Sequence, residues 1–86
     1  MLMKAVHYYK LELNTLNDIR TFIEKANTID EKLMLTDGDG YTVSAHSLMG
    51  AVYALEWNEL YLVSERDVYF LFQDFIKNST VKYKDN

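Results

Sequence analysis

The side chains that could support acid-base or nucleophilic chemistry in this sequence are few and far apart. His7 and His46 are its two histidines, one within the first predicted strand and the other at the end of the third, and two histidines so far apart in sequence are a poor basis for a metal site. Thr15 is followed three residues later by Asp18, but no histidine or lysine is placed to activate its hydroxyl as a nucleophile. The chain has no cysteine, which excludes a thiolate nucleophile and a disulfide. We therefore predict no catalytic residue, no metal site and no cofactor.

Two of the three glycines stand in the segment Asp-Gly-Asp-Gly at residues 37–40, which could be mistaken for the start of a calcium loop. Tyr41 and Leu48 occupy the places of the third acidic ligand and the closing glutamate of such a loop. A nucleotide-binding loop would need a third glycine and a strand-to-helix context. Because glycine readily adopts positive φ angles, the segment predicts a tight hairpin turn between two short strands.

Composition and charge restrict the class of protein further. Hydrophobic residues make up 49% of the chain in short runs that charges interrupt, which is typical of one packed domain. No run approaches the roughly 20 apolar residues that span a bilayer, and residues 1–10 lack a signal-type stretch, so we expect a cytoplasmic protein with no membrane partner. A net charge of −4 disfavours nucleic acid as a partner, because phosphate backbones are bound by clustered Lys and Arg.

Periodic apolar residues predict three helices, of which the clearest covers residues 17–29. Thr15 and Asp18 mark its start, since the hydroxyl can accept from a free amide and the carboxylate favours the positive end of the helix. A second, shorter helix is expected over residues 48–55 and a third over residues 67–77. The apolar face of the third helix would contain Val68, Leu71, Phe72, Phe75 and Ile76.

Residues 3–13, 32–36, 41–45 and 60–63 are expected to form strands. The resulting order, β-α-β-β-α-β-α, predicts an α+β fold, an open-faced sandwich in which a four-stranded antiparallel sheet has three helices on one face. Residues 1–77 would form this single domain. Residues 78–86 would form a polar C-terminal tail, which we expect to fray.

The run Val-Ser-Ala-His-Ser-Leu-Met-Gly at residues 43–50 resembles the signature of the HPr phosphocarrier family of the sugar phosphotransferase system. In that signature a strand ends in a serine, and an apolar pair and a glycine then open the second helix. The predicted order of elements over residues 4–76 also agrees. The resemblance implies an HPr-like sandwich for most of the chain.

HPr proteins carry phosphate on a histidine at the start of the first helix, where backbone amides and a nearby arginine stabilise the anion. In this sequence the position of that histidine falls on Thr15, that of the arginine on Asn17 and that of the following proline on Asp18. His7 and His46 cannot replace the histidine by spacing. The resemblance therefore implies an HPr-like variant that lacks the active-site histidine and does not transfer phosphate through it.

Ser47 matches the serine that a dedicated kinase phosphorylates in some HPr proteins, although a helix cap explains it more simply. The second helix is apolar on more sides than one sheet contact can cover, and the resemblance implies that Leu48, Met49 and Val52 form a partner interface. The alternative is that the last helix covers them. Tyr69 and Phe70 point away from the apolar face of that last helix, which suggests a homodimer or a second contact surface.

Together these observations predict a non-catalytic regulatory or adaptor protein that binds a protein partner. The alternative is a small-ligand sensor or minor enzyme on a ferredoxin-like α/β sandwich, which depends on analogy of fold alone. An RNA-binding sandwich is disfavoured by the negative charge and by the lack of interleaved basic and aromatic residues.

Overall fold

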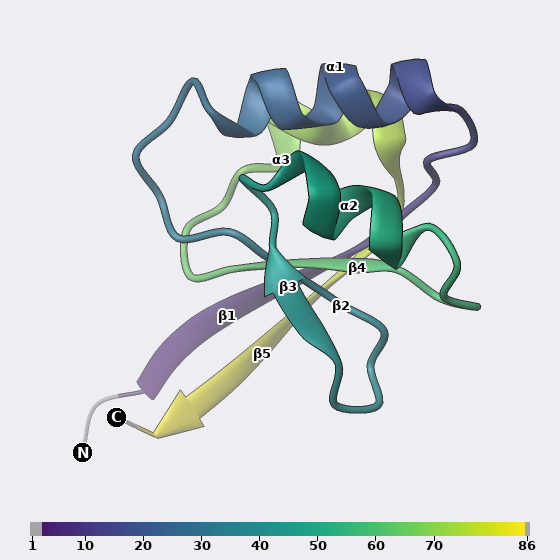
Figure 1. The fold of residues 1–86 in the computed structure, drawn as a ribbon. Coiled ribbons are helices and arrows are strands. Elements are labelled where there is room, and N and C mark those ends of the chain that lie inside the picture. The colour runs from purple at the N-terminus through teal and green to yellow at the C-terminus, as the bar shows by residue number, and fades with distance from the viewer. Residues whose placement is uncertain (1–2, 86) are drawn as a thin grey trace.

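Five strands form one antiparallel sheet, and three helices cover one of its faces (Figure 1). The structure is a computed structural model, and it describes residues 3–85. The strands lie in the order β3-β2-β4-β1-β5. In chain order the elements are β1 (Met3–Leu11), α1 (Leu16–Ala26), β2 (Met34–Thr36), β3 (Thr42–Ser44), α2 (Leu48–Ala54), β4 (Tyr61–Ser64), α3 (Tyr69–Phe72), a 3-10 turn η1 (Gln73–Phe75) and β5 (Ile76–Asp85).

The α+β class and the helices on one face are confirmed, but the sheet has five strands where four were predicted. Ile76 and the residues after it form β5, which pairs antiparallel with β1 from Met3↔Asp85 to Leu11↔Ile76. The predicted helix over residues 67–77 is helical only in α3 and η1. Residues 78–85 of the tail that was expected to fray belong to β5.

The helix prediction failed here because an apolar residue every third or fourth position does not show where a helix ends. Phe75 closes η1, and its carbonyl accepts from the Glu12 amide at 2.8 Å, which starts the pairing with β1. Most side chains of β5 are exposed, so the strand carries no buried face that would show as alternation of apolar residues. Its β-forming residues Thr80, Val81 and Tyr83 were the available signal.

The hydrophobic core lies between α1 and the covered face of the sheet. Residues at helical spacing on α1 are buried, as predicted, and Phe22 lies with its ring centroid 4.8 Å from that of Phe72 and 6.2 Å from that of Phe75. Leu35 on β2 and Leu62 on β4 pair in register and are fully buried beneath the helices. The apolar residues of α3 and η1 therefore pack on α1.

The Tyr9 hydroxyl connects the inner strand β1 to the turn before α3. It donates to Asp67 Oδ1 at 2.8 Å and accepts from the Val68 amide at 3.0 Å, while the Tyr69 amide donates to the same carboxylate oxygen at 3.0 Å. Burial raises the pKa of Tyr9 to about 12. The Tyr69 amide and the Tyr9 hydroxyl hold the pKa of Asp67 below its usual value. These bonds fix where α3 begins.

We expect amide hydrogen exchange to show a strand at the C-terminus. Alternate amides of β5 should exchange at least about 100-fold more slowly than in an unstructured peptide, because bonds to β1 must open first, and the intervening amides should exchange fast. Uniformly fast exchange along residues 77–84, measured by NMR, would mean that the segment frays as the sequence analysis expected.

Tyr9→Phe should lower the free energy of unfolding by about 1–3 kcal/mol, because the buried Val68 amide loses its acceptor. Urea unfolding would measure this change. Tyr8→Phe is the matched control: Tyr8 lies on the open face of the sheet, where Lys84 Nζ donates to its hydroxyl at 3.1 Å, and its loss should cost under about 0.5 kcal/mol.

Alkaline pH gives a second measurement of the same variant. A tyrosine whose folded pKa is raised contributes stability that is complete below its unfolded pKa of about 10 and is lost as the pH rises toward the folded value. The Tyr9→Phe variant should therefore lose less stability than the unmodified chain between about pH 10 and 12. Equal losses would contradict the buried hydrogen bonds assigned to Tyr9.

Candidate partner-binding surface

The helix α2 begins at a serine cap that directs it across the covered face of the sheet. Ser47 has extended backbone angles, φ −99° and ψ 120°, and its hydroxyl accepts from the Gly50 amide at 3.2 Å. The predicted N-cap is confirmed, and the Ser47 side chain lies at the surface. Its phosphorylation stays a prediction.

Small residues form the buried side of α2. A Cβ atom added to Gly50 would lie 3.3 Å from Val43 Cβ and 3.4 Å from the Ser44 carbonyl oxygen, so a glycine lets the helix approach β3 closely. Ala51 and Ala54 are fully buried against the core. The helix therefore makes its contact with the domain through residues that have little or no side chain.

Large apolar residues form the opposite, exposed side of α2. Exposed fractions are 52% for Leu48, 83% for Met49, 42% for Val52 and 61% for Tyr53. We call these four residues the α2 surface. The alternative that the last helix covers them is wrong, because they are exposed, and Phe72 of α3 and Phe75 of η1 pack on Phe22 of α1. The structure thus brings Leu48, Met49 and Val52 together on one exposed face.

His46 ties the start of α2 to the loop after α1. Its Nε2 atom lies 2.7 Å from the Glu31 carbonyl oxygen, and its Nδ1 atom lies 2.9 Å from Asn27 Oδ1. Because the Glu31 carbonyl can only accept, Nε2 carries the proton and donates it. The bond to Glu31 holds this junction, which gives the histidine a positioning role.

Thr15 caps α1 and places a carboxylate at its first turn. The Thr15 hydroxyl accepts from the Asp18 amide at 3.0 Å, and Asp18 Oδ2 accepts from the amides of Asn14 at 3.0 Å and Thr15 at 3.2 Å. This is the predicted capping box. The carboxylate supplies the negative charge that a helix N-terminus favours, and it would repel a phosphoryl group there.

Comparison of the chain with protein families, curated proteins and solved structures finds no match. Within residues 3–85, no helix is long and apolar enough to cross a membrane. The same residues bring together no group of three or more His, Asp or Glu side chains able to hold a metal ion.

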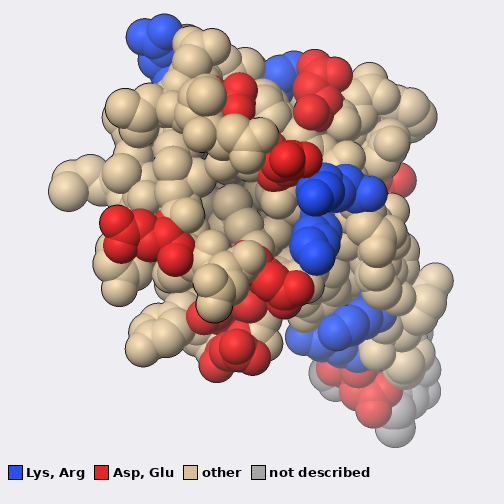
Figure 2. Space-filling view, turned by 90° about the vertical axis from the view of Figure 1, so that its right-hand side faces the viewer, with Lys and Arg blue, Asp and Glu red and all other residues tan. Residues whose placement is uncertain are grey.

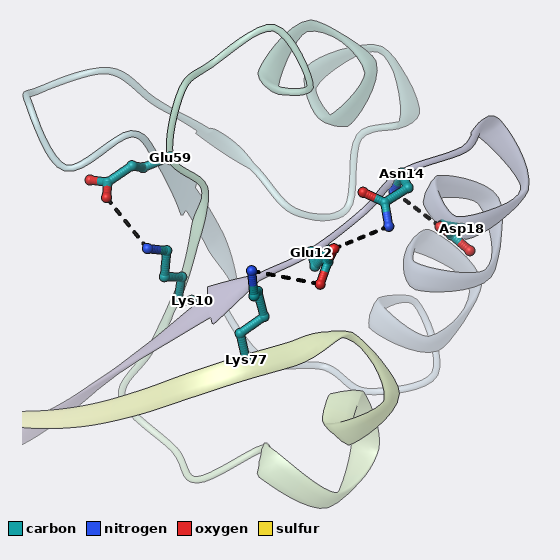
Figure 3. A network of polar contacts seen from close by, with 6 residues as sticks. All are labelled: Lys10, Glu12, Asn14, Asp18, Glu59 and Lys77. Carbon is teal, nitrogen blue, oxygen red and sulfur yellow. Dashed lines mark hydrogen bonds and ion pairs between the residues drawn. The ribbon is translucent and has the colours of Figure 1, made fainter.

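A polar network next to the start of α1 joins four segments of the chain (Figure 3). Lys10 pairs with Glu59 at 3.5 Å and Lys77 with Glu12 at 3.8 Å, while Asn14 Nδ2 donates to Glu12 at 3.4 Å. These pairs are exposed, so each contributes about 0–1 kcal/mol. They border a hollow of about 330 Å³. Both lysines of the network are paired with carboxylates. We therefore assign the network a structural role, in which it links β1, β5 and the loop after α2.

Tyr69 and Phe70 are at the surface, as predicted, with exposed fractions of 38% and 81%. Their rings meet edge to face with centroids 5.7 Å apart. Self-association through this pair stays a prediction.

The open face of the sheet contains a hollow that the sequence analysis did not predict. It measures about 620 Å³ and lies between Tyr8 of β1, Tyr61 of β4 and the β2–β3 turn. Lys82 borders it on the side of β5, with its Nζ atom 4.8 Å from the centroid of the Tyr8 ring. Its lining comes from all five strands and the β2–β3 turn, and β5 was expected to be a tail, so the order of residues in the sequence did not reveal it.

Gly50→Val should lower the free energy of unfolding by about 1–3 kcal/mol, because the added carbons overlap Val43 and push α2 away from β3. Met49→Val is the matched control at the neighbouring position, which is exposed, and should change it by less than about 0.5 kcal/mol. Chemical denaturation would compare the two. Equal stability of both variants would contradict the close approach of α2 to the sheet.

Proposed function

We propose that this chain is a non-catalytic, HPr-like regulatory or adaptor protein that binds a protein partner through the α2 surface. One observation carries the proposal: α2 packs on the domain through its glycine and two buried alanines and exposes Leu48, Met49 and Val52. A helix on a domain that binds nothing would ordinarily direct its large apolar side chains inward. Apolar residues grouped on a surface mark sites of association.

The HPr-like part of the proposal is supported by local structure at the residues that carry the resemblance. Within residues 43–50 a strand ends in a serine, Ser47 caps the helix and Gly50 permits its close packing. The order of elements from β1 to α3 is the order that the resemblance implies, and β5 is an addition to it.

The absence of phosphotransfer in the proposal follows from the start of α1. Thr15 stands where the family places its histidine, and the Asp18 carboxylate accepts from two amides at that helix end. A regulatory phosphate on Ser47 would add about two negative charges beside Leu48, which would change which partners the α2 surface can bind. The proposed setting is the cytoplasm, where a partner from sugar uptake or its transcriptional control fits the resemblance.

Met49→Glu should weaken binding of the partner at least about tenfold, because a charge would be buried in the interface without a counterion. The measurement is capture from a bacterial lysate on the immobilised chain, followed by titration of the recovered protein. The proposal expects regulators of sugar uptake or of transcription to be recovered.

Phe70→Glu is the control for Met49→Glu, since it places the same charge on an equally exposed apolar residue of α3. It should leave capture unchanged. A loss of capture with Phe70→Glu alone would move the interface to α3. Capture that survives Met49→Glu in a folded variant would contradict the α2 surface as the docking site.

The hollow on the open sheet face favours a second candidate function, a small-ligand sensor. It combines the aromatic rings of Tyr8 and Tyr61 with threonine hydroxyls from β2, β3 and β5. Such a mixture of apolar area and a few polar groups is typical of ligand sites. A metabolite that raises the melting temperature of the chain, and whose effect disappears in Tyr61→Ala, would support this function.

A further inference from the structure

A second feature beside α2 has a different chemical character from the α2 surface. It is a hollow of about 590 Å³ between the β2–β3 turn and the end of α2, and we call it the aromatic hollow. Three aromatic side chains line it: Tyr41 after the turn, Tyr53 on α2 and Trp57 in the loop that follows. Tyr41 and Tyr53 are 65% and 61% exposed, so their rings are available to a ligand.

The rings of Tyr53 and Trp57 stand at 85° to one another, with centroids 6.3 Å apart. Perpendicular rings form two walls of a corner, and an aromatic face attracts a cation that lies within about 6 Å of its centroid. Trp57 has the more electron-rich ring for this purpose. The corner therefore favours a positively charged group over a neutral one.

Carboxylates border the same hollow, from Asp37 and Asp39 in the turn and from Glu56 and Glu59 in the loop after α2. Glu59 is paired with Lys10. In the part of the chain that the structure describes, no Lys or Arg nitrogen lies within 4.0 Å of the carboxylates of Asp37, Asp39 or Glu56. Asp37 Oδ1 accepts from the amides of Asp39 and Tyr41, which holds the turn beside the rings.

Charge is unevenly distributed on one face of the molecule. Figure 2 shows acidic side chains together at the left and lower centre of this face and Lys and Arg side chains at the centre right and lower right, while side chains of both charges lie at the top. Such separation orients an approaching basic segment toward the acidic side before contact.

We propose that the aromatic hollow binds an arginine side chain presented by an extended segment of the protein partner. A guanidinium group is planar, stacks on aromatic rings and forms two parallel bonds to a carboxylate, and the hollow offers both kinds of contact. Tyr53 belongs to both the hollow and the α2 surface, so a partner that covers α2 reaches the hollow without a break. The inference rests on the proposed function, which supplies a protein as the partner, and it adds that this partner presents an arginine.

The probe is an acetylated and amidated peptide, Gly-Ser-Arg-Ser-Gly, titrated into the intact chain. The chain contains one tryptophan, so the emission of Trp57 and the NMR signal of its indole N–H report on the hollow directly. We expect a saturable change that is weakened by salt. The same peptide with citrulline, the neutral isostere of arginine, should bind at least about tenfold more weakly, since the cation–π and ionic contacts are lost.

Matched variants separate the hollow from general charge. The double variant Asp39→Asn, Glu56→Gln should weaken binding of the arginine peptide at least about fivefold. Glu24→Gln, Asp74→Asn removes the same charge from exposed positions outside the hollow and should change binding less than about twofold. Equal losses of binding in the two double variants would show that the effect depends on net charge alone, and would overturn the inference.

Two further outcomes would also overturn it. Equal binding of the arginine and citrulline peptides would show that the rings bind apolar groups without regard to charge. A change in Trp57 emission with protein concentration alone would assign the hollow to a second copy of this chain. A failed peptide titration combined with loss of partner capture in Met49→Glu would reject the arginine site and leave the proposed function intact.

Discussion

The close approach of α2 to β3 is the constraint on which the binding surfaces depend. A side chain at position 50 would meet Val43 and the Ser44 carbonyl, so the residue there is glycine, and the next buried positions of the helix are alanines. A helix of seven residues that sits this close has little room for large side chains beneath it. Leu48, Met49 and Val52 are consequently directed to solvent, and the proposed docking surface is a result of how the domain packs.

The strand β1 provides the second constraint, because it pairs along both of its edges, with β4 and with β5. On the face of the sheet that the helices cover, the Tyr9 hydroxyl donates to Asp67 and accepts from the Val68 amide, and these two bonds fix the chain where α3 begins. Along one edge, β1 pairs with β5 over its whole length. The lysines of β5 are exposed along this outer strand, and like charges there oppose pairing with the edge of another sheet. The basic residues of the C-terminus are thus part of the sheet and also protect it.

Sequence reasoning succeeded where a local pattern determines local structure. Thr15 and Asp18 predicted the start of α1 because a capping box needs only residues three apart, and the helical spacing of its apolar residues predicted its buried face. Ser47 and the exposed side of α2 were found from the residues and from the resemblance to HPr proteins.

The end of α3 and the strand β5 were missed, because apolar residues at positions 71, 72, 75 and 76 fit a longer helix, and only pairing with β1 selects a strand at Ile76. The aromatic hollow was missed because Tyr41, Tyr53 and Trp57 lie near one another only after the sheet and α2 have packed.

The pairing of Met3 with Asp85 has a practical meaning for the use of this domain. Both ends of the described chain leave the sheet at one corner, and Figure 1 shows α2 on the far side of the molecule from that corner. A tether attached at either end, or at both, would leave the α2 surface and the aromatic hollow unobstructed. Two neighbouring ends would allow the domain to be inserted into a loop of another protein while the proposed binding surfaces stay exposed.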